Sequence, residues 1–232
     1  MGSVSHPRLA PRRSATGGTW WSKAVLRAVE EAAFSQTDLK RGRALARAGA
    51  VGSISVTEGS AVAAVHERDD TFTVTVTVPV LDDVGAATFV EVVAAESGRI
   101  GALLAGQLPH PFVEAIEEAG VELLPYGGEL GAACTCDAWL DPCPHALAVL
   151  TQVAWLIQAE PFVLTHLRGL SREVVLQRLH DMTLRPGDGA ATGSDEALGR
   201  TDDDLAVAVD AADRAARAVE LFEQGRADDL TL

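Results

Sequence analysis

The hydrophobic positions of the chain follow a helical period in its first third. Apolar residues recur at helical spacing between residues 20 and 34, at Trp21, Val25, Leu26, Val29 and Ala33. With Thr19 or Ser22 as the cap, this pattern predicts a helix over about 20–34. A second helix is predicted from a cap at Thr37 and Asp38 to Gly49, because glycine commonly ends helices.

The period then changes from 3.6 to 2, which predicts antiparallel strands. Ile54 and Val56 alternate with serine and threonine, and the turn residues 58–59 follow. Residues 71–78 alternate between four threonines on one face of the predicted strand and Phe72, Val74, Val76 and Val78 on the other. Residues 60–65 form the expected middle strand, although their alanines leave its register open. One face of this sheet should therefore be buried and the other should face water.

Helical patterns return after residue 84. They continue to residue 119, with breaks at Ser97–Gly98 and at the prolines 109 and 111. A short strand is predicted over 129–135, a helix that is apolar nearly all round over 144–158, and a further helix over 171–180. Helices that are apolar on every side are buried. The predicted fold class is α+β, with N-terminal helices and a strand meander followed by a strand–helix unit and trailing helices.

Composition divides the chain into four predicted parts. Residues 1–18 are rich in Pro, Gly, Ser and Arg and are expected to form a flexible arm. Residues 19–128 form the helical and antiparallel-strand region, and residues 129–185 form the strand–helix unit with its trailing helices. Residues 186–232 are predicted to be an acidic linker and a terminal helix outside the core.

Charge is distributed unevenly along the chain. The net charge is −14, of which residues 1–50 contribute +6 and the remainder −20. An acidic body repels phosphate backbones, so only the first 50 residues could bind nucleic acid electrostatically. The candidate nucleic-acid contacts on the two N-terminal helices are Lys23, Arg27, Lys40, Arg43 and Arg47. The alternative is a solvated basic face that pairs with nearby carboxylates.

The chain is expected to be a soluble cytoplasmic protein with no membrane contact. No run approaches the roughly 18 apolar residues of a membrane span, and no apolar segment follows the N-terminal arginines as in a secretory signal. The cysteines, at positions 134, 136 and 143, are odd in number. Without an export signal, this count favours reduced thiols over a disulfide scaffold.

Those cysteines belong to one cluster of metal-ligating residue types. Cys134, Cys136, Cys143 and His145 follow the spacing C-x-C-x6-C-x-H. Four soft or borderline ligands suit a closed tetrahedral site for one structural Zn²⁺. Alternate residues of a strand point to the same face, so the first two cysteines can reach one ion.

Cys143 and His145 can both reach one ion if they lie at the start of a helix. Residues i and i+2 do not face each other inside a helix, whereas Pro144 favours the first helical position. Cys143 is therefore predicted to be the N-cap, with His145 in the first turn, where free N–H groups and the helix dipole stabilise a thiolate. The alternatives are a redox-active cysteine pair, or buried cysteines beside an unrelated histidine. Neither explains a helix that starts at Pro144.

The cluster resembles the SWIM zinc finger, whose pattern is C-x-C, a variable gap and C-x-H. The similarity extends to Trp139, Pro142 and the small apolar residues 146–149. It also includes Trp20 and Trp21, the helix end at 43–49, the strand meander and residues 103–109, so that it covers about residues 17–182. Asp137 and Pro144 depart from residues common in the family, but neither is a ligand. The resemblance implies zinc binding, interaction with DNA or protein, and association with Swi/Snf-type helicases.

These observations predict a non-catalytic interaction module. Four protein ligands leave zinc no open position for chemistry, and no nucleophile-elbow, Walker or dinucleotide motif occurs. No catalytic residue or small-molecule substrate is therefore expected. The leading hypothesis is a protein–protein adaptor for a Swi/Snf-type helicase or a similar nucleic-acid-remodelling complex, and the alternative is direct DNA binding through the basic helices.

Several other residue types have structural interpretations. Trp20 and Trp21 could stack on bases, but tryptophans beside an amphipathic helix are more often core residues. The remaining histidines that could be considered as ligands lie outside metal-ligand spacing of one another, and we interpret each as structural or solvated: His66, His110, His166 and His180.

Overall fold

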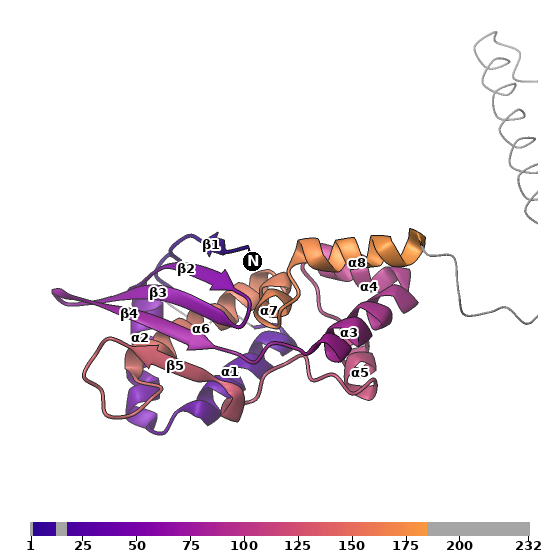
Figure 1. The fold of residues 1–232 in the computed structure, drawn as a ribbon. Helices are drawn as coiled ribbons and strands as arrows, with labels where there is room; N and C mark the ends of the chain where they lie inside the picture. The colour runs from indigo at the N-terminus through magenta and orange to yellow at the C-terminus, as the bar shows by residue number, and fades with distance from the viewer. Residues whose placement is uncertain (1, 13–17, 185–232) are drawn as a thin grey trace, which may run out of the picture. The chain divides into compact units, whose positions relative to one another are not determined.

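Five strands form one antiparallel sheet in the order of the chain (Figure 1). The computed structural model describes residues 2–12 and 18–184. The strands are β1 (Val4–His6), β2 (Val51–Thr57), β3 (Ser60–Glu67), β4 (Asp70–Thr77) and β5 (Gly131–Cys134). Together with the helices they give the α+β class that the sequence predicts.

Alternation of side chains fixes the sheet's two faces. Val74 and Val76 of β4 are buried, and the threonines beside them point away from the core. In β3 the buried residues are Ala61, Ala63 and Val65, and Ala63 pairs with Val74. Register is well specified where one face is buried, because a one-residue slip would turn every core side chain outward.

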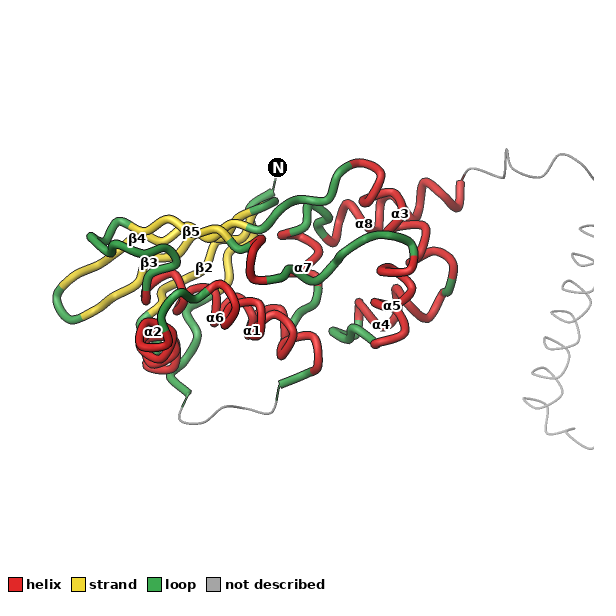
Figure 2. The backbone as a smooth tube through the Cα atoms, turned by 90° about the horizontal axis from the view of Figure 1, so that it is seen from below, coloured by secondary structure: helices red, strands yellow, loops and turns green. Residues whose placement is uncertain are grey.

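Three helices cover the buried face of the sheet (Figures 1 and 2). They are α1 (Trp20–Ala32), α2 (Gln36–Ala48) and α6 (Pro144–Ala159). α6 contacts α1, α2 and strands β2 to β5, and nearly all of its residues are buried, as its uniformly apolar sequence predicts. α2 begins at the cap Ser35, slightly before the predicted cap, and ends as predicted at Gly49 in the left-handed conformation.

A second group of helices gathers beyond one end of the sheet (Figure 1). α3 (Asp83–Ala95) contacts α4 (Ser97–Leu104), α5 (His110–Glu118) and α8 (Arg172–Leu184). The breaks between α3, α4 and α5 fall at the predicted positions. Two short elements were not predicted: the 3-10 helix η1 (Gly127–Glu129) and the helix α7 (Phe162–Leu167).

The predicted flexible arm is wrong for residues 4–12. β1 pairs with β2, with Val4 opposite Val56. The Arg8 guanidinium donates to the Gly49 carbonyl at 2.8 Å, and the Arg12 N–H donates to the Arg47 carbonyl at 2.9 Å. The free backbone groups of the β2 edge and of the α2 C-terminus bind this segment, although its own composition resembles a linker.

The predicted boundary between residues 128 and 129 does not separate two cores. α6, which follows the cysteines, packs on α1 and α2 of the N-terminal region. The described residues belong to one compact unit that spans Met1–Leu184. The predicted linker and terminal helix at 186–232 lie outside the described residues. Within the described part of the chain, no helix is long and apolar enough to span a membrane.

Candidate metal centre

Cys134, Cys136, Cys143 and His145 meet at one point where β5 and α6 approach each other. Each residue offers one ligand atom, and these atoms all lie within 4.8 Å of one another. Cys143 and His145 are buried, and the other two cysteines are partly buried. Among the described residues this is the only group of His, Cys, Asp or Glu side chains with that geometry. The structure therefore brings all four predicted ligands together.

The end of β5 directs the first two cysteines. Cys134 pairs with Val74 of β4, so it shares the face that α6 covers. Thr135 extends the pairing, because its N–H donates to the Thr73 carbonyl at 3.1 Å and its hydroxyl accepts from the Thr73 N–H at 3.0 Å. These bonds hold Thr135 against β4 where the chain leaves the strand and bends, at Thr135 and Cys136. Beyond this bend, the Cys136 thiol lies within 4.8 Å of the other ligand atoms.

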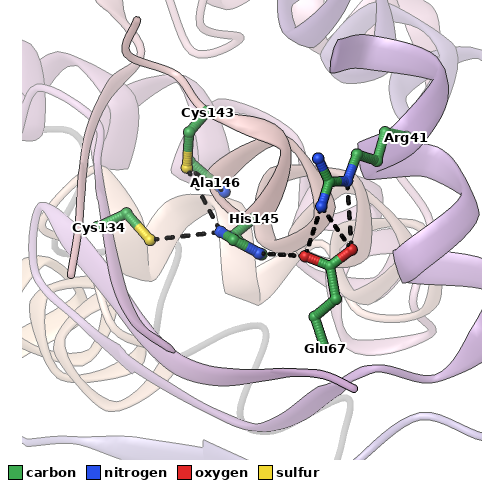
Figure 3. A network of polar contacts seen from close by, with 6 residues as sticks. All are labelled: Arg41, Glu67, Cys134, Cys143, His145 and Ala146. Atoms are coloured by element: carbon green, nitrogen blue, oxygen red, sulfur yellow. Dashed lines mark hydrogen bonds and ion pairs between the residues drawn. The ribbon is translucent and has the colours of Figure 1, made fainter. Parts of the chain in front are cut away.

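The start of α6 directs the second pair, as the sequence predicts. Cys143 is the N-cap, and its Sγ accepts from the Ala146 N–H at 3.5 Å, while Pro144 occupies the first helical turn. His145 follows in the same turn and turns its Nδ1 toward the sulfurs (Figure 3). A free helix N-terminus favours negative charge, so this position suits a thiolate ligand.

The spacing of the donor atoms fits zinc. His145 Nδ1 lies 3.8 Å from Cys134 Sγ and 4.0 Å from Cys143 Sγ. Bond lengths of about 2.3 Å to sulfur and 2.0–2.1 Å to nitrogen place tetrahedral ligand atoms about 3.6 Å apart. A Cys3His donor set of this size suits a single structural Zn²⁺.

Burial controls the protonation of the free thiols. It raises the pKa of Cys134 to about 12, and it also raises the pKa of Cys143. Burial acts in the same direction at Cys136, but hydrogen bonding to His145 and to the Ala138 backbone outweighs it and lowers that pKa. Because zinc binds thiolates, metal binding must displace protons from Cys134 and Cys143.

Two charged residues that the sequence did not single out complete the site (Figure 3). Glu67, at the end of β3, places Oε2 2.9 Å from His145 Nε2. Arg41 of α2 donates from Nη2 to both oxygens of Glu67 at 2.8 Å and from Nε to Oε1 at 3.2 Å. These bonds from Arg41 and from His145 lower the pKa of Glu67. Glu67 lies on the same face of β3 as the buried residues Ala63 and Val65. A carboxylate at a core-facing strand position is therefore the feature of the sequence that points to Glu67.

The five predicted nucleic-acid contacts lie on the helix surfaces. Arg27 pairs with Glu31 at 2.9 Å, and Arg43 pairs with Glu30. Lys23, Lys40 and Arg47 are exposed. Two of the five cations are therefore paired with carboxylates of α1, as the solvated-face alternative predicts.

Trp21 belongs to the core, and Trp20 is partly buried and packs against it. The Trp20 indole N–H donates to the Leu108 carbonyl at 2.9 Å, and that of Trp21 donates to the Ile157 carbonyl at 3.1 Å. The other four histidines named above also make structural contacts or lie at the surface. His166 contacts the Gly2 carbonyl, His66 contacts Thr71, and His110 contacts Glu114.

Comparison with known proteins agrees with this geometry. Residues 118–154 match the family model of the SWIM zinc finger. Since this segment holds the CxCx6CxH ligand set with its four donor atoms within 4.8 Å of one another, the chain contains a SWIM zinc finger with a site that fits one structural Zn²⁺.

A relative extends the similarity beyond the finger. The uncharacterized protein Rv2102 of Mycobacterium tuberculosis is 29% identical over 187 residues, which is 80% of this chain. The match spans 66% of that protein's length, so it is the longer of the two. No solved structure matches the chain.

Proposed function

We propose that the chain is a non-catalytic, zinc-dependent protein–protein adaptor, in association with a Swi/Snf-type helicase or a similar nucleic-acid-remodelling complex. The donor set supports the non-catalytic part. Catalytic zinc keeps one position for water or substrate, whereas three thiolates and one imidazole fill a tetrahedral site. The zinc then organises the surface formed by the loop between Cys136 and Cys143.

The observation that carries the proposal is a tryptophan on this zinc loop. Trp139 is 97% exposed, and Leu140 next to it is 43% exposed. The loop is fixed at both ends, because Cys136 and Cys143 are ligands and Pro142 is buried. Tryptophan is enriched among residues that dominate binding energy at protein interfaces, and a prearranged anchor loses little entropy on binding.

Charge around the anchor favours a protein partner over nucleic acid. Asp137 and Asp141 flank Trp139 and Leu140, and both acids are exposed. Phosphates would be repelled from this loop, whereas an apolar pocket with a basic rim would complement it. The proposed partner surface therefore has that chemistry.

We expect Trp139→Ala to weaken partner binding by about 30-fold or more without loss of zinc. Truncation of an interface anchor costs about 2 kcal/mol or more, which is about a 30-fold weaker Kd. Affinity capture with the native chain, followed by mass spectrometry, identifies the partner. Calorimetry with the purified partner then measures Kd, and metal analysis measures the zinc content of each variant.

Phe34→Ala is the matched control for this experiment. Phe34 is also an exposed aromatic residue, at 76%, but it lies in the connection between α1 and α2. Its loss should leave Kd unchanged. Equal effects of the two substitutions would contradict a specific role for the zinc loop. A captured set without an ATPase of the helicase type would contradict the Swi/Snf link.

Direct DNA binding is the alternative, and it predicts a different salt dependence. Binding through Lys23, Arg27, Lys40, Arg43 and Arg47 would use about five phosphate contacts, with a log–log salt slope near −4.5. We expect no binding tighter than about micromolar at physiological salt, because the rest of the chain is acidic. Fluorescence anisotropy on single- and double-stranded oligonucleotides over a salt series measures both quantities. Nanomolar binding that disappears in the double variant Arg43→Glu, Arg47→Glu would replace the adaptor proposal.

A further inference from the structure

A continuous polar chain leads from α2 to the metal ligand His145 (Figure 3). Arg41 donates to the Glu67 carboxylate from Nε and Nη2 of its guanidinium, and Glu67 Oε2 lies 2.9 Å from His145 Nε2. The opposite ring nitrogen, Nδ1, faces the sulfurs of Cys134 and Cys143. The histidine thus has a carboxylate on one side and the metal position on the other.

This arrangement settles which nitrogen of His145 can bind zinc. Neutral imidazole has one N–H donor and one lone pair. A carboxylate at 2.9 Å accepts a hydrogen bond, so the proton belongs on Nε2 and the lone pair on Nδ1. Carboxylate partners of this kind fix the tautomer and the orientation of zinc-bound histidines and make them stronger ligands.

The neighbours of Glu67 hold the carboxylate in place. Glu67 is the last residue of β3 and pairs with Asp70 of β4, and its side chain is only 20% exposed. Arg41 supplies three charge-assisted hydrogen bonds, one from Nε and two from Nη2, and this fork geometry limits rotation of the carboxylate. On its flat side the His145 ring stacks against Phe72, with ring centres 4.3 Å apart. The ring is therefore fixed in direction and in plane.

We propose that Glu67 is a positioning residue for the zinc ligand His145 and that Arg41 holds Glu67 in its working orientation. Both residues come from the N-terminal region, on elements β3 and α2, and not from the segment 118–154 that matches the finger family. The affinity of the finger for zinc thus depends on residues outside the finger. This inference concerns metal binding and stands apart from the adaptor proposal.

The test compares zinc affinity in the full chain and its variants. We expect Glu67→Ala to weaken zinc binding by about 10- to 100-fold and to speed zinc release to a chromogenic chelator. Arg41→Ala should have a smaller effect in the same direction, because Glu67 can still contact His145. Glu67→Gln should recover most of the affinity, since its amide oxygen also accepts from Nε2–H. Circular dichroism shows that each variant is folded.

A spectroscopic measurement separates positioning from general destabilisation. Co²⁺ in place of zinc has ligand-field bands that depend on ligand geometry, and these bands should change in Glu67→Ala and be restored in Glu67→Gln. The matched control is Arg43→Ala, which breaks a different ion pair of α2, with Glu30 of α1. Its cobalt spectrum and zinc affinity should equal those of the native chain.

Three results would overturn the proposal. The first is a native cobalt spectrum together with native zinc affinity in Glu67→Ala. The second is an equal loss of affinity in Arg43→Ala and Glu67→Ala, which would assign the effect to lost ion pairing on α2 in general. Failure of Glu67→Gln to restore the spectrum would likewise contradict positioning through the hydrogen bond.

Discussion

Purified Cys143→Ser protein is expected to contain no zinc and to melt well below the native protein, which should hold one zinc per chain. A ligand present at about 1,000 times its Kd adds about 4 kcal/mol of stability. In a domain of this size such a loss lowers Tm by roughly 8–16 °C. The effect should spread beyond the finger, because α6 begins at the metal site and packs on α1, α2 and the sheet.

The substitution by serine tests the loss of the metal ligand without the loss of the helix cap. Cys143 is the N-cap of α6, and serine is a favoured N-cap residue, so the substitution keeps the cap and removes the thiolate. Metal analysis and calorimetry measure zinc content and Tm. Treatment of the native protein with a chelator should reproduce both changes. A native preparation that is folded without zinc would refute the assignment of a structural metal.

The ligand set could be predicted from sequence because every part of it is local. Strand spacing predicts that Cys134 and Cys136 face one ion, although the strand ends at Cys134, and Pro144 starts the helix that positions Cys143 and His145. The burial of α6 was equally predictable, since its sequence is apolar on all sides. Short-range geometry determines both features, and no long-range contact is needed to recognise them.

The supporting contacts could not be predicted because they join distant parts of the chain. Glu67 is 78 residues from His145, and Arg41 is 26 residues from Glu67. The core-facing position of Glu67 on β3 indicates that its side chain points inward, but it does not indicate which residues it will meet. β1 was missed for the same reason, because its pairing depends on the free edge of β2 and not on its own composition. Sheet order and helix packing decide such contacts.

The second large effect is expected at Gly42, where α2 crosses the start of α6. A Cβ at Gly42 would lie 2.7 Å from Leu147 Cβ and 2.8 Å from the Pro144 carbonyl oxygen. Both neighbours belong to the helix that carries His145, and neither is the free end of a long side chain. Gly42→Val should therefore force α2 away from α6, at a cost of about 3 kcal/mol or more. It should also weaken zinc binding, since Arg41 would move with the helix.

Gly101→Ala tests whether this cost arises from close packing or from the residue change alone. Gly101 lies inside α4, and a Cβ there would meet nothing within 4 Å. Alanine at that position should stabilise the chain by about 1 kcal/mol, because it favours the helix. Gly42→Ala also increases helix propensity, but the added Cβ collides with α6. Urea unfolding of this variant should therefore show a net loss of stability. Equal stabilisation by the two alanines would mean that the contact of α2 with α6 does not require glycine and that Arg41 is held in place by other contacts.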